Sequence, residues 1–290
     1  MVLDLSSRGD RLLDPGHVLL TEAAFGARPD IDLADLPGTA DPAGAWLRAV
    51  VLGGRGWYAG ARTELLGATR RTRDPVLISL LVSTEASLLR QLGWHARAAV
   101  LDGRALALVV DARSDASPRW RRHEAVCDAL IGLAADALGT GQPRVSARLL
   151  ARCRGELDRR PGSPRSLVRW HWVSAETGLA APGARLVEEP PMVHAEAALA
   201  AAGELGSIRH QVKSRLLMAA AAAGAGDVDR SRDLAADVDA QSSGHGLLPL
   251  RWAAAMLRSG VCEPAEAARA AAQAGELARI LAGRGGQLRA

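Results

Sequence analysis

A six-residue frame that occurs twice in this chain restricts the folds open to it. Residues 56–61 read Gly-Trp-Tyr-Ala-Gly-Ala and residues 93–98 read Gly-Trp-His-Ala-Arg-Ala, so the pattern Gly-Trp-aromatic-x-x-Ala recurs after 37 residues. From residue 41 onward, segments of roughly 12 to 17 residues with helical periodicity alternate with short turns that contain Gly or Pro. A recurrence of this length is typical of folds that stack one small unit repeatedly.

Composition favours helices over strands. Ala, Leu and Arg dominate the chain, whereas Phe and Tyr occur once each. Ala, Leu and Arg have high helix propensity, and the β-branched and aromatic residues that favour strands are scarce. Leu, Val and Ala must therefore fill the core, and abundant Ala lets helices approach one another closely. We predict an all-α fold.

Small residues around the two frames follow the spacing of tetratricopeptide repeats. In that family a unit of about 34 residues has a small residue midway along its first helix, a Gly at the turn and Ala in its second helix. A Gly at that turn would end the first helix in a left-handed conformation. The chain resembles the family at Ala49, Gly56, Tyr58, Ala61, Ala86, Gly93, Ala98, Ala219, Gly226 and Gly260.

The resemblance implies a TPR-like right-handed α-solenoid of about five to six antiparallel helix pairs over residues 42–282. The match weakens between residues 113 and 191, and a hinge is expected near 188–191. Residues 1–41 contain several Pro-bearing breakers and are expected to form an N-terminal arm with a short helix, and 283–290 a flexible tail. An irregular helical bundle and a helical enzyme core remain open as alternatives.

Patterns typical of catalysis or cofactor binding are missing from the sequence. A phosphate-binding loop needs Gly before its Lys, but the only lysine, Lys213, lies in a helical segment after Val. The glycines of residues 53–56 follow a helix and not a strand, so they do not form a dinucleotide fingerprint. His123 begins a zinc-protease-like pattern, but Cys127 stands where the second His is needed. We predict a non-catalytic protein with no cofactor and no metal site.

Arginine is concentrated in one stretch of the chain. Residues 144–171 contain eight arginines and two acids, whereas the whole chain has a formal net charge of only +4. Arg144, Arg148 and Arg152 recur every four residues, which places three guanidiniums on one face of a helix. Like charges at this spacing repel, so neighbouring acids or an anionic partner would relieve them. A solvated face with Glu partners and a docking surface are both open.

A docking surface in this region would bind an acidic protein or peptide. Arginine would supply bidentate hydrogen bonds to carboxylates, and tryptophan would supply stacking. Nucleic acid is the less favoured ligand, because a mild excess of positive charge does not call for it. Trp46, Trp57, Trp94 and Trp252 are expected in the core. The predicted partner-binding residues are Arg119, Arg121, Arg122, Arg144, Arg148, Arg152, Arg169 and Trp170.

The resemblance implies a protein-interaction scaffold that binds a peptide or helix of a partner protein on its concave, first-helix surface. The alternative is a sensor or effector domain of a transcription-regulation system that contacts nucleic acid through its arginine-rich face, although no helix-turn-helix is recognisable. The near-exclusive use of Arg over Lys indicates a GC-rich genome, and we expect an actinobacterial source.

Three widely spaced cysteines, Cys127, Cys153 and Cys262, are typical of free thiols in a reducing compartment. No secretory signal is visible, and the longest apolar run, residues 216–226, is too short to cross a bilayer. We therefore predict a cytoplasmic protein without membrane insertion. The sequence leaves its oligomeric state open.

Overall fold

The computed structural model describes residues 15–38, 41–110, 119–159 and 163–289, without the side chains of 119 and 120. These residues form helices, turns and loops and contain no strand, which confirms the prediction of an all-α fold. The helices are α1 (Pro15–Phe25), α2 (Pro42–Gly54), α3 (Tyr58–Arg71), α4 (Pro75–Gln91), α5 (His95–Val110), α6 (Arg119–Gly139), α7 (Pro143–Arg159), α8 (Pro164–Ala180), α9 (Pro191–Glu204), α10 (Ile208–Gly224), α11 (Val228–Gly244), α12 (Leu248–Val261) and α13 (Pro264–Gly283).

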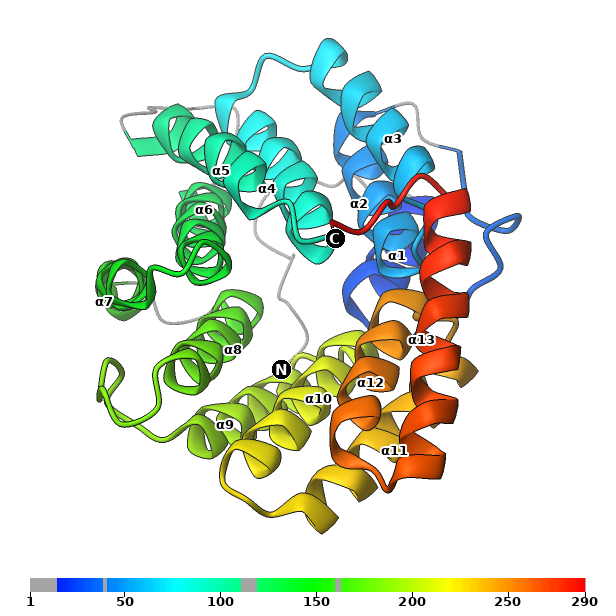
Figure 1. Ribbon diagram of the computed structural model, residues 1–290. Helices are drawn as coiled ribbons and strands as arrows, with labels where there is room; N and C mark the ends of the chain where they lie inside the picture. Colours follow the sequence, from blue (N-terminus) through cyan, green and yellow to red (C-terminus); the bar gives the residue numbers. More distant parts are fainter. Residues whose placement is uncertain (1–14, 39–40, 111–118, 160–162, 290) are drawn as a thin grey trace.

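The helices pack in chain order. Each helix from α2 to α13 contacts the next one, and each even-numbered helix from α2 to α10 also contacts the following even-numbered helix. In Figure 1 the elements follow one another around a ring, and the end of α13 returns to the turn between α2 and α3. The even-numbered helices, which are the first members of six consecutive pairs, therefore form a continuous inner layer.

Local sequence signals explain where several helices begin and end. Asp41 caps α2 by accepting hydrogen bonds from the backbone of Ala43 and Gly44, and Asp74 caps α4 in the same way. A proline follows each cap at the first helical position, where its missing N–H costs nothing. The two caps fix the start of the first helix in the first two pairs.

The small residues that carry the family resemblance lie mostly at helix contacts. Gly56, Gly93 and Gly226 have φ angles of +80°, +83° and +84° and end α2, α4 and α10 in the left-handed conformation that favours glycine. Gly260 differs, because it lies exposed within α12, which continues to Val261. The fully buried members of the set are Ala49, Tyr58, Ala61, Ala86, Ala98 and Ala219.

The two ends of the described chain join distant parts of the ring. Helix α1 forms within the predicted N-terminal arm and packs against α2 and α10. Residues 284–289, expected to be a flexible tail, instead lie across the start of α3 and the α4–α5 turn (Figure 1). The Arg289 backbone N–H donates to the Leu92 carbonyl at 2.8 Å, and the Trp94 indole N–H donates to the Gln287 carbonyl at 3.0 Å. We call residues 284–289 the closing segment.

The hinge predicted near residues 188–191 falls in the loop 181–190, and the two helices that this loop joins, α8 and α9, pack along one another. Within the described residues, no helix is both long enough and apolar enough to span a bilayer.

Candidate functional site

A cavity of about 640 Å³ lies on the inner side of the ring. All six even-numbered helices from α2 to α12 line it, and Phe25 of α1 and His95 of α5 complete the wall. Its volume is within the range of roughly 300 to 1,000 Å³ that is usual for ligand sites in proteins. The cavity is therefore the place where the first helices of all pairs present side chains to one common space.

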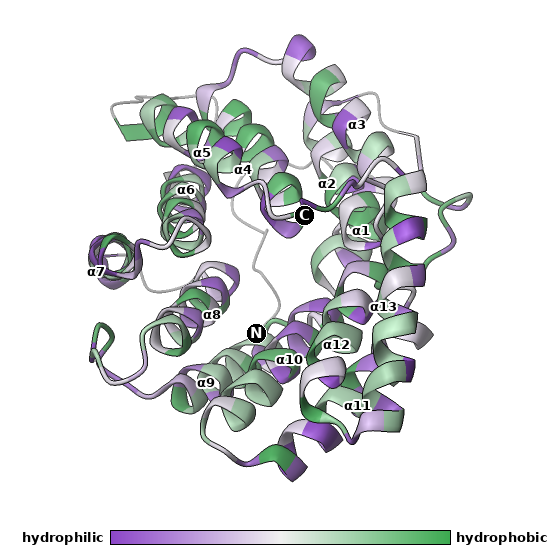
Figure 2. Ribbon diagram, in the orientation of Figure 1, coloured by the Kyte–Doolittle hydropathy of each residue, from purple (hydrophilic) through white to green (hydrophobic). Residues whose placement is uncertain are grey.

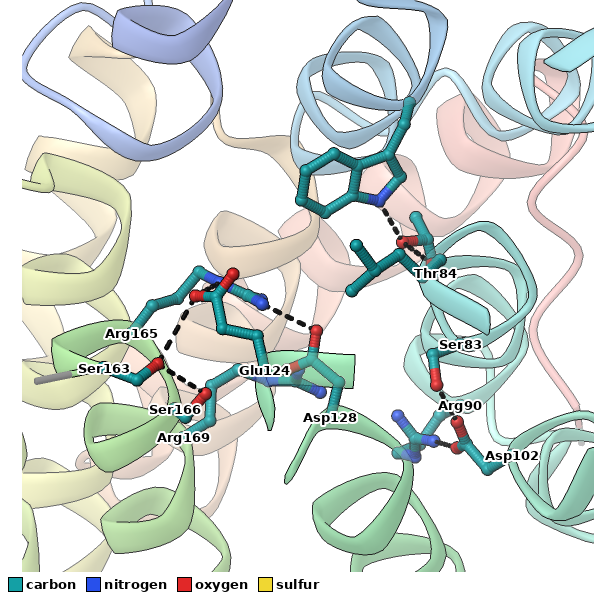
Figure 3. Close-up of polar contacts among 12 residues, drawn as sticks. Ser83, Thr84, Arg90, Asp102, Glu124, Asp128, Ser163, Arg165, Ser166 and Arg169 are labelled. Atoms are coloured by element: carbon teal, nitrogen blue, oxygen red, sulfur yellow. Dashed lines mark hydrogen bonds and ion pairs between the residues drawn. The ribbon is translucent and has the colours of Figure 1, made fainter. Parts of the chain in front are cut away.

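One part of the cavity wall is an ion-pair cluster centred on Asp128 of α6 (Figure 3). Its carboxylate accepts hydrogen bonds from Arg165 at 2.7 Å and from Arg169, both on α8. Glu124 lies 3.5 Å from Arg165 and accepts a hydrogen bond from Ser163. Burial disfavours the charged form of Asp128, but the two guanidiniums outweigh this effect and hold its pKa below the usual value.

A second cluster lies around Arg90 of α4. Its guanidinium pairs with Asp102 of α5 and with Asp136 of α6, the latter at 2.8 Å, and the Ser83 hydroxyl donates to Asp102 at 2.7 Å. Gly132 makes room for this cluster, because a Cβ at that position would lie 2.1 Å from an Asp102 oxygen. Burial raises the pKa of Asp102 to about 7, although Arg90 opposes the shift.

Arg209 of α10 has no acidic partner in the described part of the chain. Its guanidinium donates to the Ala24 carbonyl oxygen at 3.2 Å and lies 6.0 Å from the centre of the Phe25 ring. Burial and, after it, the positive charges of Arg165 and Arg169 together lower the pKa of Arg209 to about 10. Arg209 therefore lies in a region of positive potential and stays charged at neutral pH.

Aromatic rings flank these charges. The Phe25 ring has the Arg165 guanidinium 5.2 Å from its centre, and the Trp172 ring has the Lys213 ammonium at 4.5 Å. His210 stacks on Trp172, with ring centres 5.1 Å apart and planes inclined by 18°. Burial, together with nearby positive charges such as that of Arg209, lowers the pKa of His210 well below its usual value, so this imidazole is neutral near pH 7 and adds no charge.

The predicted partner-binding residues do not share one surface. Arg144, Arg148 and Arg152 are exposed on α7, on the side away from its buried Leu150 and Cys153. Figure 2 shows that α7 carries both hydrophilic and hydrophobic residues, as expected for a helix with one exposed and one buried side. None of the three arginines forms an ion pair within the described residues, so the Glu partners of a solvated face are not found. We call these three residues the outer arginines.

The other members of the predicted set lie elsewhere. Arg169 faces the cavity beside Asp128, and Trp170 donates from its indole to the Leu150 carbonyl at 3.0 Å, between α8 and α7. Arg122 donates to the Val110 carbonyl at the end of α5, and Arg121 lies beside it in the first turn of α6. The side chain of Arg119 lies outside the described residues.

Most residues that line the cavity were not predicted from the sequence. Arg90, Arg209, Lys213 and Trp172 line it, but none was singled out as a binding residue. A usable signal was present, since Arg209 and Lys213 repeat the four-residue spacing of Arg165 and Arg169 on another first helix. Of the four tryptophans expected in the core, Trp46 is buried, Trp94 and Trp252 are half-buried, and Trp57 is 40% exposed. The Trp57 ring instead packs against the closing segment, where the Arg284 guanidinium lies 4.2 Å from the centre of the ring.

Comparison with known proteins adds no assignment: no protein-family model matches the chain, and no curated protein matches it. In the described residues, no group of three or more His, Cys, Asp or Glu side chains is arranged to hold a metal ion. The interpretation of the site therefore rests on the cavity and its side chains.

Proposed function

We propose that the chain is a non-catalytic protein-interaction scaffold, a TPR-like right-handed α-solenoid, that binds a segment of a partner protein in its inner cavity and acts in the cytoplasm. The ordered packing of six helix pairs supports the solenoid, because stacked units contact their neighbours in sequence. Two of the three free cysteines, Cys127 and Cys153, are buried, as is common for thiols of a reducing compartment.

The observation that carries the proposal is that the first helices of all six pairs line one cavity. Its wall combines aromatic rings, aliphatic side chains and a guanidinium that has no acidic partner among the described residues. Interfaces that bind protein segments tightly use such buried aromatic and arginine side chains. An acidic segment fits this wall better than a basic one.

The size of the cavity favours an extended segment over a helix. An α-helix with its side chains is about 10 to 12 Å thick and needs a wide groove along its whole length. An extended chain is thinner and advances about 3.3 Å per residue. We therefore expect a few residues of the partner, in extended conformation, to enter the cavity.

A display selection tests the proposal. Random heptapeptides would be selected on the purified protein, and the recovered peptides measured against two variants. Ser87→Trp fills the cavity from α4, whereas Ser243→Trp adds the same side chain on the exposed side of α11. We expect at least a tenfold loss of affinity with Ser87→Trp and none with Ser243→Trp. Recovery of no peptide, or equal binding to both variants, contradicts the proposal.

The outer arginines support a second candidate function. Arg144, Arg148 and Arg152 are exposed at successive turns of α7 and form no ion pair within the described part of the chain, as a phosphate-binding face requires. The domain would then contact nucleic acid as part of a transcription-regulation system. Binding would weaken with salt, by a slope of about 0.9 in log units per phosphate neutralised on duplex DNA. Replacing all three by Gln should remove most of that slope.

A further inference from the structure

The charges around Arg209 do not balance. Arg165, Arg169 and Arg209 bring three positive charges to one side of the cavity, and Glu124 and Asp128 bring two negative charges that are bound to the first two arginines. Lys213 is compensated separately by Glu176, which lies 3.6 Å away. One positive charge, at Arg209, is left without a partner in the described residues.

An uncompensated charge in this position is unfavourable until an anion arrives. Arg209 is partly removed from water, packs against Gly54 and uses one of its N–H groups on the Ala24 carbonyl. A guanidinium has five N–H donors, and two of them can bind a carboxylate side by side. The remaining donors of Arg209 are therefore available to a ligand in the cavity.

The charge count favours a monoanion. A carboxylate would neutralise the single excess charge, whereas a phosphate group, with about −1.5 to −2 charges at pH 7, would leave a buried negative excess. Asp128 would also repel a second negative charge, because it lies on the same wall of the cavity. A sulfonate or carboxylate satisfies this condition, and carboxylate is the group that peptides and small metabolites commonly carry.

The aromatic and aliphatic walls of the cavity favour a flat apolar body attached to that carboxylate. Phe25, Trp172 and Trp252 line the cavity together with aliphatic residues of α10 and α12 such as Leu217 and Leu250. Stacking and apolar burial between such rings would add to the charge interaction. A small or purely polar anion would make no apolar contact with these aromatic and aliphatic side chains.

We infer that the inner cavity is a binding site for one carboxylate joined to a flat apolar body, with the carboxylate on Arg209 and the body among Phe25, Trp172 and Trp252. This inference rests on the proposed use of the cavity but not on a protein partner. The same chemistry occurs in an acidic side chain beside an aromatic residue of a peptide and in a free aromatic acid.

The first experiment compares 2-naphthoate with its uncharged amide, 2-naphthamide, on the unmodified protein by titration calorimetry at pH 7. The two probes share the flat body and differ in charge. We expect the acid to bind about tenfold to a hundredfold more tightly, as charge-assisted hydrogen bonds of about 1.5 to 3 kcal/mol predict. Equal affinities, or binding of neither probe, overturn the inference without use of any variant.

Variants then locate the carboxylate. Arg209→Gln should reduce the preference for the acid to less than threefold, and Arg209→Lys, which keeps the charge but loses the planar donor pair, should retain part of it. The matched control Arg148→Gln removes the same group from the outer face of α7 and should change nothing. A loss of preference with Arg148→Gln, or an unchanged preference with Arg209→Gln, overturns the assignment to Arg209.

Peptides separate this inference from the proposed function. A peptide recovered in the display selection would be compared with copies in which Glu or Asp is replaced by its amide, or in which the C-terminus is amidated. We expect a loss with the side-chain amide and none with the terminal amide. Cavity-dependent peptides that contain no acid would overturn the inference and leave the scaffold standing. If the protein bound 2-naphthoate but the selection recovered no peptide, the inference would stand and the proposed peptide-binding function would be contradicted.

Discussion

Two groups of arginines in this protein differ in almost every physical respect. Arg165 and Arg169 lie on an inner helix, share the buried carboxylate of Asp128 and face a cavity. The outer arginines stand on α7 in water and form no ion pair within the described residues. The inner group is therefore part of the folded core, whereas the outer group could change with little effect on folding.

The contrast teaches that the number of arginines in a stretch of sequence says little about their role. The same 28 residues, 144–171, contain both groups. Water screens the outer charges, and exposed pairs contribute about 0 to 1 kcal/mol at most. Inner charges are removed from water, so each must be compensated by the protein or by a ligand. Burial, and not spacing, divides the two groups.

The largest expected effect follows from removing the shared inner carboxylate. Asp128→Ala leaves Arg165 and Arg169 without their partner, and we expect the free energy of unfolding to fall by about 3 to 5 kcal/mol. The control is Asp158→Ala, which breaks an exposed pair with Arg154 and should cost less than about 1 kcal/mol. Urea unfolding followed by circular dichroism measures both. Similar losses in the free energy of unfolding for the two variants would contradict the claim that inner charges contribute more to stability than outer charges.

Removing the closing segment should have the next largest effect. A chain that ends at Gly283 loses five hydrogen bonds between residues 284–289 and the first two helix pairs, each worth about 0.5 to 1.5 kcal/mol. We expect a loss of about 3 kcal/mol and a wider ring, because α13 would no longer be tied to α3 and the α4–α5 turn. Small-angle scattering would detect the widening. An unchanged profile and an unchanged unfolding curve would show that the segment does not hold the ring.

The pH dependence of stability probes another inner charge. Burial raises the pKa of Asp102 to about 7, above its ordinary value of 3.8, so the folded protein holds a proton that the unfolded chain has lost. Asp102 should therefore make stability fall as pH rises from about 4 to 7, by at most about 1.4 kcal/mol per pH unit, and become constant above pH 7. Asp102→Asn should remove this component of the slope. Identical pH profiles for the two proteins would contradict it.

The outer arginines should give the smallest effect. Replacing Arg144, Arg148 and Arg152 by Gln removes like charges at four-residue spacing, whose repulsion is about 0.2 to 0.5 kcal/mol per pair. We expect the midpoint of urea unfolding to stay the same or to rise slightly. A clear fall in stability would mean that these side chains have structural contacts that their exposure does not reveal.

Much of the fold could be predicted from the sequence because its signals are local. Helix propensity, the caps at Asp41 and Asp74, and the left-handed glycines at 56 and 93 act within one turn of chain. The prediction that Gly260 ends α12 in a left-handed turn was wrong, although it also relied on a local signal. The turn lies later, where the extended Glu263 precedes Pro264 at the start of α13, and it contains no left-handed residue. Local rules offer more than one way to end a helix.

The cavity could not be predicted in the same way, because it depends on contacts between distant residues. Arg209 meets Phe25 and Gly54 across more than 150 residues of chain. The closing segment likewise reaches Leu92 from the far end of the chain. A run of arginines is visible in the sequence, but an arginine without an acid among the described residues is recognised only when its neighbours are known.

Tryptophan signals offer the most direct test of the claim that ligands bind inside the ring. In protein labelled with ¹⁵N-tryptophan, the indole N–H signals would be assigned by substitution and followed during titration with 2-naphthoate. Trp46, Trp172 and Trp252 line the cavity, and Trp57 is exposed at the closing segment. We expect the first three signals to shift together with one affinity, while that of Trp57 stays in place. Shifts confined to Trp57 and Trp170, with the cavity signals unmoved, would contradict an inner binding site.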